Sequence, residues 1–280
     1  MSASFFIVPQ WQGSGSSRAM RLIDGAEAIR GDLPTPSTVS VEVPPDAGTD
    51  LGSGVHRLSA VQTVRDRLLV ALRSGSGIPV VVGGDCGVEL GAVQHALARD
   101  GVAVVWLDAH ADLNTPESSP SGAFSGMVLR TLLGDGPASA VPSPTLDPSR
   151  LVLAGVRSLD DAESDFIAAS GIAHLDPGAL DPRSISAAVA ATGATAVYVH
   201  LDLDVIDPAE FACVAAPEPF GVPFQMLLDV VAAIRATLPL VGAGITGFAP
   251  ATPEAADGDA TSILRVIGAL TRDAPSSPRG

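Results

Sequence analysis

The 280-residue sequence has few cysteines, few basic residues and no long apolar run, and each shortage excludes a class of protein. Two cysteines, Cys86 and Cys213, cannot form a disulfide framework, so we expect a reducing, cytoplasmic location. Sixteen Lys and Arg against 31 Asp and Glu give a net charge of −15, which disfavours nucleic acid and anionic membranes as partners. No apolar run reaches the length of a transmembrane helix. The first residues lack the basic segment that begins a signal peptide.

The sequence does contain a regular alternation of short apolar runs and helical patterns. A hydrophobic content of 46% with 17% charged residues is typical of an ordered globular protein. We expect helices at 58–73, 87–99, 224–238 and 259–271, and strands at 4–8, 39–43, 78–83, 102–108, 151–155, 172–175, 196–202 and 241–248. The alternation predicts one α/β domain over 1–273, with a mainly parallel sheet in a three-layer α-β-α arrangement, and a tail over 274–280.

Two short motifs place acidic residues directly after strand-like runs. Asp108, His110 and Asp112 follow the run at 102–107, and Asp202 and Asp204 end the run at 196–202. Side chains two residues apart on an extended chain point to the same side. Ligands collect at the carboxyl ends of strands in open parallel sheets. Four carboxylates and one imidazole suit two divalent ions, and oxygen-rich ligation favours manganese or magnesium.

A third motif, Gly83-Gly84-Asp85-Cys86-Gly87, follows the strand-like run at 78–83. By itself, a lone cysteine such as Cys86 is more often a small buried apolar residue than a ligand. Together, the three motifs resemble the ureohydrolase family, which includes arginases, agmatinases and formiminoglutamases. The resemblance extends from Asp108 through Asn114, Ser121 and Met127, and from Asp202 through Pro208. It implies an arginase-like fold over most of the chain.

The resemblance also implies two Mn²⁺ ions whose bridging hydroxide attacks a guanidinium carbon. The first ion would be bound at four positions, Cys86, Asp108, Asp112 and Asp202. The second would be bound by His110, Asp108, Asp202 and Asp204, so that Asp108 and Asp202 bridge the two ions. Asp207 would support the metal ligands from behind. The substrate would be a small cationic amino acid.

The resemblance assigns further residues to the substrate. Asn114 and Ser121 would bind its α-carboxylate, and Asp160 its α-amino group. Glu163 lies near enough in sequence to reach the substrate through water. Ser125 stands where arginases have a proton-shuttling histidine, so any catalytic group at that position must be a hydroxyl.

Three departures from the family pattern bear on the substrate. Cys86 replaces a histidine ligand, Ser125 replaces the histidine acid, and Gly247 replaces a glutamate that binds guanidinium. A general acid contributes about 10² to 10⁴ in rate, and a charge-assisted hydrogen bond about 1.5–3 kcal/mol. We therefore expect plain arginine to be a poor substrate. An N-hydroxylated guanidine is less basic and carries an extra donor and acceptor.

The sequence thus predicts hydrolysis of N-omega-hydroxy-L-arginine to L-ornithine and hydroxyurea. An arginase-type or agmatinase-type ureohydrolase and a non-catalytic regulatory protein that binds metal are the alternatives. The other histidines, His56, His95, His174 and His200, are expected to serve packing, and Glu218 to lie in a loop near the pocket mouth. No segment carries an assembly signal, so the oligomeric state is left open.

Overall fold

The structure is a computed structural model that describes residues 2–272, and the expected tail over 274–280 lies outside the described residues. The described residues form one sheet in which every neighbouring pair of strands is parallel. The strand order is β2-β1-β3-β8-β7-β4-β5-β6. The strands are β1 (Ala3–Val8), β2 (Thr38–Ser40), β3 (Ile78–Gly83), β4 (Val102–Leu107), β5 (Leu151–Ala154), β6 (Ala173–Leu175), β7 (Ala196–Asp202) and β8 (Leu240–Thr246).

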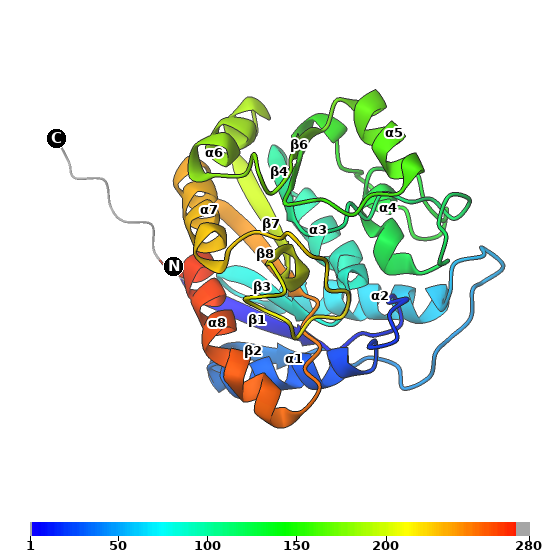
Figure 1. Cartoon of the computed structure of the whole chain (residues 1–280). Helices are drawn as coiled ribbons and strands as arrows, with labels where there is room; N and C mark the ends of the chain where they lie inside the picture. The colour runs from blue at the N-terminus through cyan, green and yellow to red at the C-terminus, as the bar shows by residue number, and fades with distance from the viewer. Residues whose placement is uncertain (1, 273–280) are drawn as a thin grey trace.

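Helices cover both faces of this sheet, which gives the three layers seen in Figure 1. One face is covered by α1 (Arg21–Gly31), α6 (Pro182–Ala191), α7 (Phe224–Thr237) and α8 (Pro253–Thr271). The other is covered by α2 (Leu58–Ser74), α3 (Glu89–Leu97), α4 (Val128–Leu132) and α5 (Asp161–Ser170). The predicted three-layer α/β fold is confirmed. No helix among the described residues is long and apolar enough to cross a membrane.

The central strands explain why the sheet is buried on both sides. All six residues of β4 are buried, and successive side chains enter opposite cores. Val105 and Leu107 pack with the α6 and α7 side, whereas Val104 and Trp106 pack with the α2 and α3 side. An uninterrupted apolar run is therefore what a strand in this position requires.

The expected strands all occur, but the expected helices are only half of those observed. The predictions at 58–73, 87–99, 224–238 and 259–271 correspond to α2, α3, α7 and α8, and α8 begins earlier, at Pro253. The unpredicted helices are α1, α4, α5 and α6. The α5 helix buries only Glu163 and the α6 helix only Ile185 and Val189. The α5 helix lacks the apolar stripe on which a prediction from periodicity depends, and α4 is only five residues long.

Candidate metal centre and substrate pocket

The three sequence motifs meet at one edge of the sheet. They follow β3, β4 and β7, which lie with β8 as four adjacent central strands. Gly84 allows the β3 end to approach the loop after β1, because a Cβ at this position would lie 1.6 Å from the carbonyl oxygen of Gln10. Asp85 fixes the contact by accepting hydrogen bonds from Gln10 Nε2 (2.9 Å) and from the backbone N–H of Gly13 (2.9 Å) and Gly87 (2.8 Å).

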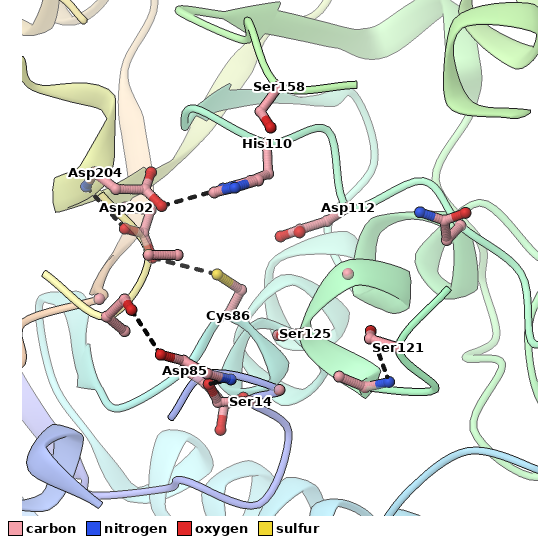
Figure 2. Close-up of a pocket in the computed structure, with 18 of the residues that line it drawn as sticks. Ser14, Asp85, Cys86, His110, Asp112, Ser121, Ser125, Ser158, Asp202 and Asp204 are labelled. Carbon is pink, nitrogen blue, oxygen red and sulfur yellow. Dashed lines mark hydrogen bonds and ion pairs between the residues drawn. The ribbon is translucent and has the colours of Figure 1, made fainter. Parts of the chain in front are cut away.

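A cavity of about 500 Å³ opens at this edge. Figure 2 shows Cys86, His110, Asp112, Asp202 and Asp204 pointing toward one another on its floor. The predicted substrate residues also line the cavity, and they are Asn114, Ser121, Ser125, Asp160 and Glu163. Asp108 lies behind the floor, buried at 1% exposure.

Two groups of described side chains could each hold a metal ion, and Asp108 belongs to both. The first metal group comprises Cys86, Asp108, Asp112 and His200, and the second comprises Asp108, His110 and Asp204. Within each group, one ligand atom from every residue lies within 4.8 Å of the others. A shared aspartate is the arrangement expected of a bridging ligand.

Asp202 connects the two groups, although it belongs to neither of them. Its Oδ2 lies 3.3 Å from Cys86 Sγ and accepts a hydrogen bond of 2.7 Å from Thr246 Oγ1. Its Oδ1 accepts a hydrogen bond of 2.9 Å from the backbone N–H of Asp204. Asp202 thus contacts Cys86 of the first group and Asp204 of the second, and its role as the second bridge stays a prediction.

His110 faces the second metal group. Its Nδ1 lies 3.1 Å from Asp204 Oδ2 and 3.4 Å from Asp108 Oδ1. Its Nε2 lies 3.7 Å from Glu218 Oε1, so Glu218 reaches the site from the loop that the sequence placed at the pocket mouth. The imidazole is thus surrounded by three carboxylates.

The electrostatics of the cluster favour a bound cation. Burial and then the neighbouring Asp108 raise the pKa values of Asp112 and Asp202, and burial followed by Asp202 and Asp108 raises that of Asp204. Burial and then the nearby aspartates also raise the pKa of the Cys86 thiol. Asp112 Oδ2 is buried and has no hydrogen-bond partner among the described residues. Buried carboxylates at such close range need positive charge. The donor set therefore fits hard divalent ions.

His200 is the residue of this site that the sequence reasoning missed. Its ring is fully buried and stacks on Trp106, with ring centroids 3.7 Å apart. Its Nε2 lies 3.3 Å from Asp108 Oδ2 and its Nδ1 lies 3.3 Å from Glu89 Oε1. Burial lowers the pKa of His200, but the two carboxylates outweigh it and raise this pKa to about 10. The sequence did contain a signal for His200. It precedes Asp202 by two residues on one strand, so both side chains point to the same side of the sheet.

Two other predicted positions have hydrogen-bond partners within the protein, and their roles at the site stay predictions. Asp207 does not line the cavity, because its carboxylate accepts hydrogen bonds from the backbone N–H of Ala209 and Gly221 (both 2.9 Å) and so holds its own loop. Glu163 does line the cavity, but the backbone N–H groups of Leu113 (2.9 Å) and Asp160 (3.0 Å) already occupy its two oxygens. It belongs to the capping box of α5.

Comparison with known proteins places this geometry in a family. Residues 24–270 match the model of the arginase family. The chain belongs to the arginase family. The resemblance of its motifs to ureohydrolases is confirmed by this match.

Individual relatives of the family differ in how much of the chain they match. The Staphylococcus aureus (strain MRSA252) arginase is 36% identical over 143 residues, which are 47% of this chain and 47% of that one, so the chain matches about half the length of this curated relative. The Streptomyces lavendulae N(omega)-hydroxy-L-arginine amidinohydrolase is 27% identical over 277 residues, covering 96% and 94% of the two chains. The Entamoeba histolytica arginase structure, in complex with L-ornithine, has a TM-score of 0.84 at 22% identity, covering 96% and 97%.

Gly247, which is predicted from the sequence to replace a glutamate of arginases, has a geometry that excludes a side chain. Its φ is +86°, and a Cβ there would lie 2.2 Å from Asp202 Oδ1. We expect Gly247→Ala to weaken Mn²⁺ binding by about 10- to 100-fold, the usual cost of disturbing a metal ligand from outside. Manganese titration measures this effect. Gly193→Ala is the matched control, because Gly193 also has a positive φ but a Cβ there meets nothing within 4 Å. Equal affinity in both variants would contradict the predicted clash.

The metal-free protein is expected to lose stability as the pH rises from 5 to 7.5. Burial raises the pKa of Asp85 to about 6, whereas an unfolded aspartate titrates near 4. The folded state therefore keeps the proton more tightly, and this stabilisation is full below about pH 4 and lost as the pH rises through about 6. Two pKa units correspond to about 3 kcal/mol. The raised pKa values of Asp112, Asp202 and Asp204 act in the same direction.

Urea unfolding with a chelator at several pH values measures this trend. Added Mn²⁺ should reverse it, because ligands bind the ion in their ionised form and affinity rises with pH. A metal-free protein that becomes more stable between pH 5 and 7.5 would show that these carboxyls are ionised without a cation.

Proposed function

We propose that the chain hydrolyses N-omega-hydroxy-L-arginine to L-ornithine and hydroxyurea. Water adds to the guanidino carbon, and the bond from that carbon to the side-chain nitrogen of ornithine breaks. The observation that carries this proposal is a contrast within one cavity. The residues predicted to hold the metals and the amino acid lie in or just behind it, whereas the family resemblance puts Ser125 and Gly247 where arginases have the histidine acid and the guanidinium-binding glutamate.

The proposal includes two Mn²⁺ ions, which fit the carboxylate-rich donor set described above. Asp108 and Asp202 would lie between the ions, with Asp112 on one side and His110 and Asp204 on the other. When bound, the ions supply an activated water at neutral pH. The surrounding burial strengthens every charge interaction at the reacting carbon.

Asn114 and Asp160 support an α-amino acid as the substrate. They are joined by a hydrogen bond of 2.8 Å from Asn114 Nδ2 to Asp160 Oδ2, and Asn114 Oδ1 accepts another from Ser118 Oγ (2.8 Å). This pairing fixes a carboxylate and an amide donor side by side at the cavity wall. Asp160 would receive the α-ammonium, while Asn114 and Ser121 would face the α-carboxylate. Agmatine has no carboxylate for such a clamp.

The N-hydroxyl group of the substrate compensates for the two side chains that are missing at Ser125 and Gly247. It lowers the basicity of the guanidine, so more of the substrate is neutral and open to attack. The substrate then depends less on a carboxylate for binding its charge, which suits a site with Gly247. Its hydroxyl also brings a donor and an acceptor close to Ser125, which lines the same cavity.

Product analysis with added Mn²⁺ tests the proposal. Hydroxyarginine should yield ornithine and hydroxyurea in equal amounts. Turnover of arginine to urea at a comparable rate would instead support an arginase-type function. Binding of manganese and amino acid without turnover of either substrate would support the regulatory alternative.

A further inference from the structure

We propose that His200 is an imidazole ligand of the first metal ion and replaces the histidine that Cys86 has displaced. The family pattern leaves this ion with three carboxylates and a cysteine, which is a soft ligand for a hard ion. The inference rests on the metal-dependent function proposed above, and it assigns a ligand that the family pattern does not contain.

The strands aim the His200 ring at the metal position. His200 and Asp202 lie two residues apart on β7, so their side chains emerge on the same face. In the neighbouring β4, Trp106 pairs in register with His200, and Asp108 follows Trp106 by two residues. Stacking on Trp106 at 3.7 Å holds the ring in place. Its Nε2 is then directed at Asp108 Oδ2, the oxygen that faces Cys86 Sγ (3.9 Å).

The other ring nitrogen of His200 faces a buried carboxylate. Nδ1 lies 3.3 Å from Glu89 Oε1, and Tyr198 donates a hydrogen bond of 2.6 Å to Glu89 Oε2. Gly244 leaves the room for this carboxylate, because a Cβ there would lie 1.6 Å from Glu89 Oε1. A histidine that binds a metal almost always donates its other N–H to such a partner. Glu89 is therefore placed to accept the Nδ1–H of a ring whose Nε2 binds an ion.

The spacing of the first metal group agrees with coordination of one ion. One ligand atom each from Cys86, Asp108, Asp112 and His200 lies within 4.8 Å of the others. His200 is fully buried, and neither His200 Nδ1 nor Glu89 Oε1 has a hydrogen-bond partner by strict geometry. If the first metal group bound one ion, its ligand atoms would move closer together. The competing role is a hydrogen bond from Nε2–H to Asp108, with His200 only orienting that ligand.

Manganese titration of four variants separates the two roles. We expect His200→Gln to weaken one of two sites by more than 100-fold, which exceeds the 10- to 100-fold typical of a residue that only orients a ligand. His174→Gln is the matched control, because His174 lies on β6 and contacts the Val156 carbonyl instead of the site. Adding Cys86→His to the His200→Gln variant should raise its Mn²⁺ affinity by at least about 10-fold. This increase should exceed the increase that Cys86→His causes in the parent protein. Equal gains in both backgrounds would overturn the proposal.

A crystal structure of the parent protein with Mn²⁺ gives a result that no variant's folding can obscure. His200 Nε2 should lie at bonding distance from one ion, close to the 2 Å seen for imidazole and Zn²⁺. An Nε2 that still contacts Asp108 while every ion lies beyond 3 Å would overturn the assignment. Neither experiment requires turnover, so a failure of hydroxyarginine hydrolysis would leave this result standing.

Discussion

Asp202→Ala is expected to abolish hydrolysis of hydroxyarginine and to reduce manganese binding at both metal positions. Asp202 is 3% exposed and lies between Cys86 and Thr246, with Oδ2 held at 3.3 and 2.7 Å from their side-chain atoms. A bridging carboxylate contributes charge to two ions at once. Bound ions contribute several kcal/mol to such reactions, which corresponds to a rate loss of about 10³-fold or more.

The measurement combines kcat/KM with metal analysis of the same samples. Asp207→Asn is the contrasting variant, because Asp207 is predicted only to support the metal ligands and its carboxylate lies outside the cavity lining. We expect it to change kcat/KM by less than about 10-fold and to leave manganese content unchanged, since it breaks only loop hydrogen bonds. If Asp202→Ala retained two ions and the parent rate, Asp202 would not be a bridge.

The fold was predictable where one physical signal dominates the sequence. Strands such as β4 and β7 are buried on both faces, so each leaves an unbroken apolar run. The long helix α2 has a buried stripe that includes Val61, Val64 and Leu68. The α5 helix has no such stripe, and capping by Asp160 and Glu163 defines its start. The sequence predicts substrate binding by Asp160 and Glu163, but it does not predict the α5 helix that positions them.

The sequence predicted which motif side chains come together at the site, but it did not predict His200 or its contacts. Motifs at strand ends placed Cys86, His110 and the four aspartates correctly because parallel strands end at a common edge. The contacts of His200 depend on a helix and two strands, since Glu89 comes from α3 and reaches past Gly244 of β8. Such a contact has no local signature. The left-handed backbone of Gly247 likewise follows from the path of the loop after β8.

Hydroxyarginine is expected to be hydrolysed with a kcat/KM about 10²-fold or more above that of arginine. The aspartates that face the metals are in place for either substrate, so the difference arises at the guanidino end of the cavity. There the hydroxyl of Ser125 is too weak an acid to replace a histidine as proton donor, and Gly247 offers no carboxylate. Arginine hydrolysis lacks both the acid and the carboxylate. Hydroxyarginine is more often neutral when it binds, so it needs the carboxylate less, and its own hydroxyl supplies a donor and an acceptor.

Ser125→His tests whether this missing acid sets the preference. Ser125 lines the cavity within the short helical turn Phe124–Met127, and its backbone N–H donates a hydrogen bond of 2.9 Å to the Gly13 carbonyl. A histidine there should raise the arginine rate by about 10-fold or more while changing the hydroxyarginine rate less, because only arginine lacks a substitute for the acid. The ratio of the two kcat/KM values should then narrow. Equal rates on both substrates in the parent protein would instead mean that its pocket recognises arginine without either family residue.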